Sequence, residues 1–271
     1  MMKYTSKSLK YVFNNLGYLV LFGLFPAVFL AYSLDTATVA AILRDYFSGR
    51  PYAGFADIFH AVSIFNFHSV SATLADILGF VLVVACVAMM MAYMEKHMRI
   101  GKKTWNGLFS KLNDNLLSTL GIAVLFSALY ELWALITSAL LLCVSFIASK
   151  TVIYVLTVAV WCVTQLALLY VVSLFYLWLP CLQITGFKSF EALSYSYQLA
   201  TGVKRTIVWE QFLSMTVAEV LFGVICVFVP WAWLELVLCA LVFAGLILIF
   251  VTRMQVAYFD RAQMERADLK K

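Results

Sequence analysis

Charged side chains are scarce in this sequence, and their scarcity excludes a soluble fold. Only 12% of the 271 residues are Asp, Glu, Lys or Arg, whereas a soluble domain carries roughly 25%. The hydrophobic fraction is 64% and the mean hydropathy is +0.95. A water-exposed globule could not bury this many apolar side chains, so the composition predicts an integral membrane protein.

Catalytic and cofactor motifs are also missing. The sequence has no GxSxG, no glycine-rich phosphate loop, no HExxH and no paired histidines, the patterns that hold a nucleophile, a nucleotide or a zinc ion. The polar residues that could cluster outside the membrane match no known enzymatic spacing; they are Asp35, Asp45, Asp57 and His60. We therefore expect a protein that is not an enzyme and has no cofactor.

Paired metal or redox ligands are absent as well. The histidines His60, His68 and His97 are predicted to lie in loops without a second ligand at helical spacing, which disfavours a zinc or haem site. The cysteines lie in or at the ends of apolar segments without CxxC spacing, so we interpret them as packing residues. They are Cys86, Cys143, Cys162, Cys181, Cys226 and Cys239.

Long apolar segments are what the sequence does have. A helix rises about 1.5 Å per residue, so about 20 apolar residues cross a hydrocarbon core roughly 30 Å thick. Six segments meet or approach this length, at residues 13–33, 75–94, 116–147, 152–182, 206–229 and 232–253. Because a lipid-exposed backbone must satisfy its own hydrogen bonds, these segments predict an all-α fold with six transmembrane helices in one domain, residues 1–271.

The basic residues predict the orientation of the six spans. Only Arg44, Arg50 and Lys150 fall on one side, and all other Lys and Arg fall on the opposite side. This asymmetry favours a bacterial cytoplasmic membrane protein with both termini in the cytoplasm. It also argues against a nucleic-acid partner, because the basic residues form short clusters between spans and no single basic face.

Two pieces outside the spans have helical patterns of their own. In the outer segment, residues 35–74, we expect two amphipathic helices that lie on the outer leaflet or pack over the mouth of the bundle, as a lid or as a substrate-binding cap. Spans three and four, each about 45 Å long if helical, should tilt or project as a hairpin capped near Ser149. The tail, residues 255–271, is predicted to be a short helical extension that ends in solvent.

A threefold internal repeat is indicated by aligning GKKTWNGL at residues 101–108 with GFKSFEAL at residues 186–193, and with a fainter copy at residues 7–9. In each copy a hydroxyl residue, Ser8, Thr104 or Ser189, stands at an expected helix N-cap. The predicted unit is an interfacial amphipathic helix followed by an out-and-back hairpin. The copies keep one orientation, unlike the inverted repeats of many secondary transporters.

The fourth span ends in LP at residues 179–180, followed by GFKSFEALSYS at residues 186–196 and TG at residues 201–202. This stretch resembles a loose group of bacterial six-span membrane proteins, which includes the membrane domain accompanying some glycerophosphodiester phosphodiesterases. The resemblance implies an all-helical inner-membrane fold. No catalytic residue carries over, because the sequence has no long soluble region to hold the phosphodiesterase barrel.

Ionisable residues inside the spans are the candidates for function. Glu131 and Glu219 stand deep in spans three and five, where a charge costs on the order of 3 kcal/mol, and Glu210 lies nearer the cytoplasm. Without a Lys or Arg at that depth, we expect each acid to be protonated, to bond groups such as Gln165 or a tyrosine, or to face water. The pattern fits either a proton or cation relay or a structural contact between helices.

A cytoplasmic basic cluster could attract anionic lipid, and it consists of Lys96, Arg99, Lys102 and Lys103. Together these patterns favour a non-enzymatic accessory or scaffold protein that binds membrane lipids or a partner membrane protein. The alternative is a small transporter or lipid translocator that uses the intramembrane carboxylates.

Overall fold

The computed structural model describes residues 2–48, 54–66, 69–147 and 149–269, and every regular element in these ranges is helical. Six helical segments are long and apolar enough to cross a membrane. The protein is therefore an all-α, multi-pass membrane protein, as the sequence predicts. The spans are α2 (Leu16–Ser33), α5 (Val70–Ile100), α6 (Leu108–Ser145), α7 (Lys150–Phe175) continuing into α8 (Trp178–Thr185), α10 (Lys204–Phe228) and α11 (Ala232–Arg261).

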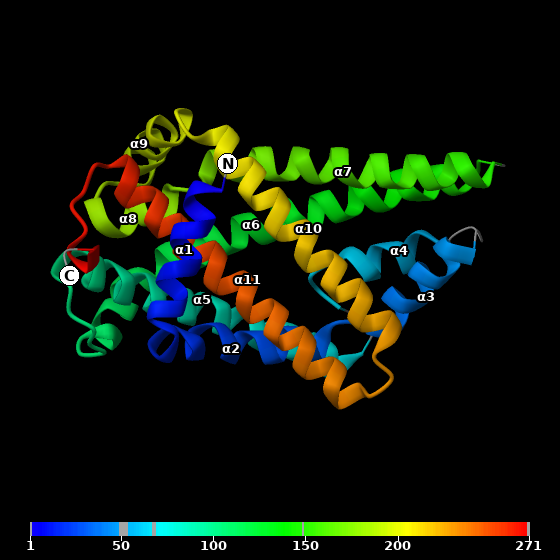
Figure 1. Cartoon of the computed structure of the whole chain (residues 1–271), viewed down its shortest axis with the longest axis horizontal. Helices are drawn as coiled ribbons and strands as arrows, with labels where there is room; N and C mark the ends of the chain where they lie inside the picture. Colours follow the sequence, from blue (N-terminus) through cyan, green and yellow to red (C-terminus); the bar gives the residue numbers. More distant parts are fainter. Residues whose placement is uncertain (1, 49–53, 67–68, 148, 270–271) are drawn as a thin grey trace.

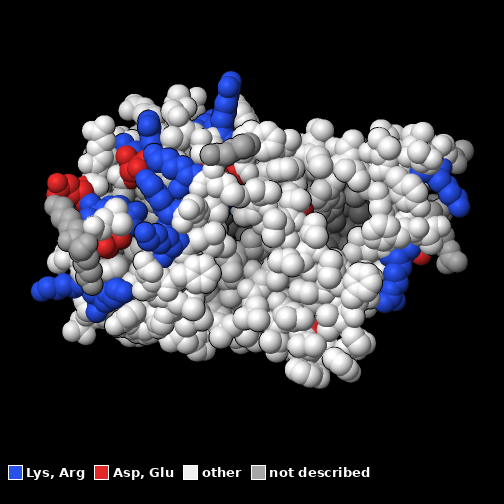
Figure 2. Space-filling model, viewed as in Figure 1, with Lys and Arg blue, Asp and Glu red and all other residues white. Residues whose placement is uncertain are grey.

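The spans alternate in direction, so the molecule has two distinct ends (Figure 1). One end, here the basic end, holds α1 (Lys3–Asn14), α8, α9 (Ser189–Thr201) and the short helix η1 (Ala267–Leu269). Lysine and arginine side chains gather over this end in Figure 2. The first and last helices meet there, because Lys3 Nζ lies 2.7 Å from Asp260 Oδ2. Both ends of the described chain thus lie on one side.

The tightest packing also lies at the basic end. The largest cluster of buried apolar side chains draws on α1, α2, α5, α8, α9 and α11. From α5 it takes Met90, Met91, Met94 and Met98, none of them more than 1% exposed. Flexible methionines fill irregular gaps between helices that cross at several angles. Between α2 and α11, Gly23 allows the close approach, since a Cβ there would stand 2.8 Å from Leu248 Cγ.

At the opposite end, here the hairpin end, α6 and α7 run side by side as a long antiparallel pair (Figure 1). Two short helices, α3 (Thr36–Ser48) and α4 (Phe55–Val62), pack against this pair and against α10. The Tyr46 hydroxyl donates to the Tyr154 carbonyl, and the Tyr154 hydroxyl donates to the Phe47 carbonyl. Of the two expectations for the outer segment, packing over the bundle is therefore the one observed.

One helix of the hairpin, α6, is longer than the other spanning helices. The 38 residues of α6 make a helix about 57 Å long, and the 18 residues of α2 make one about 27 Å long. A bilayer that matches α2 leaves the end of the α6–α7 hairpin beyond the hydrocarbon core unless the hairpin tilts strongly. The two alternatives expected from the length of spans three and four, a tilt or a projecting hairpin, both stay predictions.

The fourth span bends where a proline requires it. Proline lacks an N–H and its ring clashes with the carbonyl four residues earlier, which for Pro180 is Tyr176. The helix accordingly breaks between Phe175 and Trp178, and Pro180 lies in the first turn of α8. After α8 the chain turns at Gly186, whose φ of 71° is left-handed, and continues as α9.

The predicted N-caps of the repeat are wrong. Ser8 lies inside α1 and donates to the Tyr4 carbonyl, as a hydroxyl within a helix commonly does. Thr104 lies in the loop before α6, and Ser189 is the first residue of α9, whose N-cap is Lys188. The second copy also has no separate interfacial helix, since α6 begins at Leu108 and continues into the span. The threefold repeat itself remains a prediction.

The tail also departs from expectation. It continues the last span as a helix to Arg261, but residues 255–259 are buried among α1, α2, α5, α8 and α9. The chain then reverses at Gln263, which adopts a left-handed φ of 53°, and η1 returns to α5. Exposure begins at about residue 260, because α11 extends well past the hydrophobic span into the core of the basic end.

Candidate functional site

Glu210 is fully buried, with 1% exposure, and it holds the N-terminal helix in place. Its carboxylate accepts the Tyr4 N–H at 3.0 Å and the Thr5 N–H at 2.7 Å, together with the Thr5 hydroxyl at 2.8 Å. The first N–H groups of a helix have no partner within the helix and carry partial positive charge. A carboxylate from α10 therefore caps α1 across more than two hundred residues of sequence.

Unlike the mid-membrane depth, for which the sequence offers no Lys or Arg, the surroundings of Glu210 contain a buried basic side chain. Arg253 on α11 is 1% exposed, and its guanidinium donates to the Glu210 backbone carbonyl at 2.8 Å and to the Thr5 hydroxyl at 3.1 Å. It also donates to Ser214 and to the Tyr176 hydroxyl. The Thr5 hydroxyl thus joins a buried cation to a buried anion, and the pair supports each other's charge. In the sequence Arg253 reads only as a residue flanking a span.

Two tyrosine hydroxyls of α1 also bond neighbouring helices. The Tyr4 hydroxyl donates to Asp260, and burial together with this hydrogen bond raises the pKa of Tyr4. Burial likewise raises the pKa of Tyr11, whose hydroxyl lies 2.8 Å from His97 Nδ1. Both phenols consequently remain protonated at neutral pH.

The prediction that the histidines lie in loops is wrong for two of them. His97 lies within α5 and His60 lies within α4, while His68 falls outside the described residues.

Glu131 holds a second segment that lies outside the spans. Its carboxylate accepts the Ile64 N–H at 2.9 Å and the Phe65 N–H at 3.4 Å, and Ser63 Oγ lies 2.8 Å away. These residues directly follow α4. The carboxylate of Glu131 therefore fixes the C-terminal end of α4 to α6, because the turn offers backbone donors that no helix satisfies.

These contacts also set the depth of Glu131. The next residue after its partner Phe65 is Asn66, whose side chain donates to the carbonyl of Ser33, the last residue of α2. Glu131 consequently lies level with the hairpin end of α2 and away from the middle of the span. It is about 35 Å along α6 from Leu108, because α6 begins earlier than the sequence suggests.

Asp76 is a buried acid that the sequence analysis did not select. It is 2% exposed on α5, and its carboxylate accepts the backbone N–H of Asn66. Asp76 stands one residue inside the predicted second span, where it reads as a boundary residue. Its position inside the apolar segment could have marked it as a candidate, because an acid at the edge of a span needs a partner. Like Glu131, it fastens the segment that links α4 to α5.

Glu219 differs from these three acids in its partners. Its carboxylate accepts the indole N–H of Trp161 at 3.0 Å and the amide of Gln165 at 2.7 Å, both from α7. Gln165 is fully buried, whereas Glu219 is only partly buried. Of the alternatives expected for the two acids, a hydrogen bond to Gln165 is the one found for Glu219. Glu219 joins two spans through side chains and shares no hydrogen-bond partner with Glu131 in the described residues.

The predicted basic cluster lies at the basic end, and three of its members bind the protein itself. Lys96 Nζ donates to the Asn106 carbonyl, and Lys103 Nζ donates to the carbonyl of Asn14, the last residue of α1. Arg99 pairs with Glu95 at 2.7 Å. Within the described ranges Lys102 makes no hydrogen bond or ion pair, and its side chain is exposed. A cation at a helix C-terminus offsets the helix dipole, so part of this cluster is structural.

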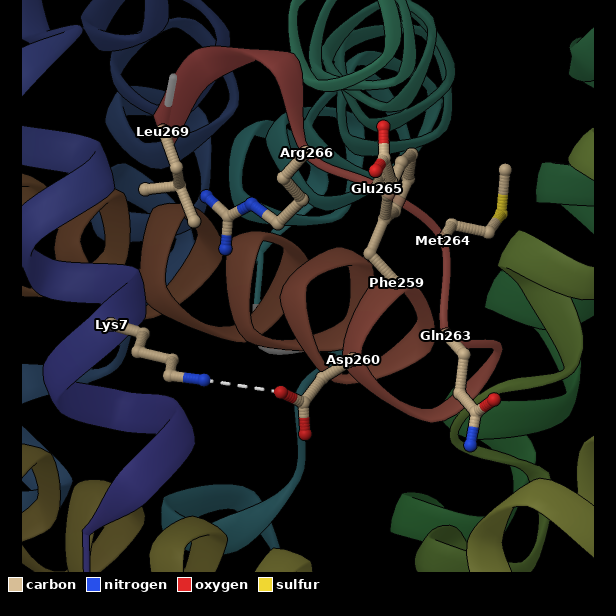
Figure 3. A pocket seen from close by; sticks show the side chains of 8 residues that line it. All are labelled: Lys7, Phe259, Asp260, Gln263, Met264, Glu265, Arg266 and Leu269. Atoms are coloured by element: carbon tan, nitrogen blue, oxygen red, sulfur yellow. Dashed lines mark hydrogen bonds and ion pairs between the residues drawn. The ribbon is translucent and has the colours of Figure 1, made fainter. Parts of the chain in front are cut away.

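A polar hollow of about 370 Å³ lies where the tail meets α1 (Figure 3). Lys7 of α1 points across it to Asp260, at 3.1 Å, and Arg266 enters it from the tail. Arg266 also pairs with Asp268 at 2.8 Å. Lys7 and Asp260 thus join α1 to the tail, whereas Arg266 and Asp268 pair within the tail. No group of His, Cys, Asp and Glu that could hold a metal ion occurs among the described residues.

Comparison with known proteins adds no assignment: no protein family, no curated protein and no solved structure matches this chain.

Proposed function

We propose that this protein is a non-enzymatic accessory or scaffold subunit of a bacterial cytoplasmic membrane, which binds lipid or a partner membrane protein. One observation supports this most directly. The carboxylates of Glu131, Glu210 and Asp76 each accept backbone N–H groups of segments that lie outside the spans. Glu210 and Asp76 are buried and Glu131 is partly buried. Acids used in this way fix the shape of both ends of the molecule, and a protein that docks to a partner needs ends of fixed shape.

The proposed orientation places the basic end in the cytoplasm and the hairpin end outside, in accordance with the excess of Lys and Arg at the basic end. The basic end then offers Lys102 and the exposed aromatic residues Trp105 and Phe109 at the membrane surface. Tryptophan and basic side chains are common where a protein meets lipid headgroups. This composition supports lipid contact at the cytoplasmic leaflet.

Extraction into lipid nanodiscs at native expression tests the proposal, with mass spectrometry of the proteins and lipids that remain bound. We expect a stoichiometric membrane protein partner or one enriched class of anionic lipid. The matched control is the same extraction of an unrelated six-span protein of similar abundance. Recovery of the pure protein with neither a partner nor an enriched lipid would contradict the proposal.

A second candidate, a small transporter or lipid translocator, rests on Glu219 alone. This acid is partly buried, lies within a span, and is held only by side chains in the described residues, so it can exchange partners without freeing a backbone group. Glu131 does not join it, because the two acids bond different segments. Proton flux into proteoliposomes tests this candidate. A flux that is lowered by Glu219→Gln and unchanged by Glu131→Gln would favour it.

A further inference from the structure

The surface has a recess toward the hairpin end, between the α6–α7 hairpin and the short helices α3 and α4 (Figure 2). The helix α10 passes beside it and contacts both α7 and α3. Glu219 of α10 bonds Trp161 and Gln165 of α7. One turn further along α10, a Cβ at Gly223 would lie 3.2 Å from Leu43 Cδ1 of α3. The partly exposed carboxylate of Glu219 thus lies where α10 passes from α7 to α3.

This carboxylate can accept more hydrogen bonds than the described chain supplies. One oxygen accepts from Gln165 and the other from Trp161, whereas an ionised carboxylate has about four acceptor sites. Both oxygens accept N–H groups, as they do in the ionised form. Among the described residues no Lys or Arg forms an ion pair with Glu219. A charged acid within a span needs a cation, and these residues do not provide one.

Aromatic side chains gather beside this acid. The rings of Trp161 and Trp133 meet edge to face with 5.4 Å between their centres, and the Tyr130 ring lies 5.0 Å from that of Trp133. Glu131 and Glu219 both act electrostatically on the Tyr130 hydroxyl, so two acids lie near these rings. Aromatic faces attract organic ammonium ions, and a carboxylate nearby adds to the attraction.

Two buried polar groups next to these rings have no hydrogen-bond partner in the described chain. Trp133 is 5% exposed, and its indole N–H is unpaired. Thr137 lies one turn further along α6 and is fully buried, and its hydroxyl is also unpaired. Buried polar groups without a partner are rare in native proteins. An oxygen atom from a bound molecule would supply the acceptor that the Trp133 N–H lacks.

We infer that Glu219, Tyr130, Trp133 and Trp161 form a binding site for a small organic ammonium ion that carries an oxygen close to its nitrogen. The ammonium group pairs with Glu219 and contacts the aromatic rings, and the oxygen accepts the Trp133 N–H. Free choline and the headgroup of phosphatidylethanolamine share this chemistry. The inference does not rest on the scaffold function. It names a ligand for the acid of the transporter candidate without requiring transport.

Calorimetric titration of the full chain with choline tests the site, in nanodiscs that contain only phosphatidylglycerol. We expect choline to bind and its uncharged carbon isostere, 3,3-dimethylbutan-1-ol, not to bind. Equal binding of the two compounds, or binding of neither, would overturn the inference. Repeating the titration with phosphatidylethanolamine in the nanodiscs identifies the source of the ligand. A weaker apparent affinity for choline assigns the site to the lipid headgroup, and an unchanged affinity assigns it to a free ammonium ion.

Three variants test the individual contacts. Glu219→Gln should weaken choline binding at least about tenfold, because the ammonium group loses its counter-charge. Glu235→Gln removes another acid, in the first turn of α11, and should leave binding unchanged. Trp133→Phe keeps an aromatic ring but lacks the N–H, so it should weaken binding of choline and not of tetramethylammonium, which has no oxygen.

The same choline affinity in the wild type and in Glu219→Gln would overturn the site. An equal loss of both ammonium ions in Trp133→Phe would overturn the contact with the oxygen. If Glu219→Gln does not fold, the comparison of choline with its isostere on the wild type still decides the inference.

Discussion

Glu210 and Thr5 lie 205 residues apart in sequence, yet the Glu210 carboxylate accepts both the N–H and the hydroxyl of Thr5. This contact closes the first helix of the chain onto the last hairpin. The same Thr5 hydroxyl accepts a hydrogen bond from Arg253. A cation, a hydroxyl, an anion and a helix N-terminus thus form one buried unit, and the stability of the basic end depends on all of them.

Removing one charge of this unit should cost more than removing both. Arg253→Met leaves the buried carboxylate of Glu210 without its cation, which should lower the free energy of unfolding by about 3–5 kcal/mol. The double variant Glu210→Gln with Arg253→Met should be more stable than Arg253→Met alone. Thermal unfolding in detergent micelles measures both, with Asp114→Asn as a control that removes an exposed charge of α6. A double variant less stable than the single one would show that the two charges do not support each other.

The close approach of α2 and α11 predicts a strong effect of a small substitution. A Cβ at Gly23 would stand 2.8 Å from Leu248 Cγ and 3.1 Å from the Ala244 carbonyl. Gly23→Ala should therefore push the helices apart and destabilise the protein by about 1–3 kcal/mol. Gly245→Ala, on the same helix pair but with open space around its Cβ, should be neutral or slightly stabilising. Equal melting temperatures for the two variants would contradict this account of the interface.

The proposed orientation predicts which sites a membrane-impermeant reagent can reach. In a background without the native cysteines, Lys150→Cys at the hairpin end should react with an impermeant maleimide in intact cells. Lys102→Cys at the basic end should react only after the membrane is permeabilised. Removal of the native cysteines matters, because Cys143 is exposed near the hairpin turn. The reverse labelling pattern would place the basic end outside.

The spans could be predicted because they depend on local composition. An apolar run of sufficient length must become a helix in lipid, and Lys and Arg mark its basic ends. The break before Pro180 could only partly be predicted, because a proline ring clashes with the carbonyl four residues earlier, yet α2 continues as one helix through Pro26. Gln165 could be named as a candidate partner for the acids because an amide within a span also needs a partner, but the sequence did not say that Glu219 is the acid it bonds.

The partners of the other acids could not be predicted in this way. The Glu210 carboxylate accepts backbone N–H groups of Tyr4 and Thr5, which lie more than two hundred residues away in sequence. The local sequence pattern of α10 does not predict a contact with α1. Arg253 reads as an ordinary flanking residue until the burial of residues 255–259 shows that the basic end continues beyond it. The depth of Glu131 depends on where α6 begins, and the polar start of that helix falls outside the apolar segment.

Hydrogen exchange in nanodiscs tests most directly the claim that the carboxylates of Glu210 and Glu131 hold segments outside the spans. Glu210→Gln should speed exchange at the first turns of α1, including Tyr4 and Thr5, and leave residues 55–66 unchanged. Glu131→Gln should do the opposite, with faster exchange at Ile64 and Phe65 and no change in α1. The account would be contradicted if neither variant exchanged faster than the wild type in either segment, because these N–H groups would then not depend on the carboxylates.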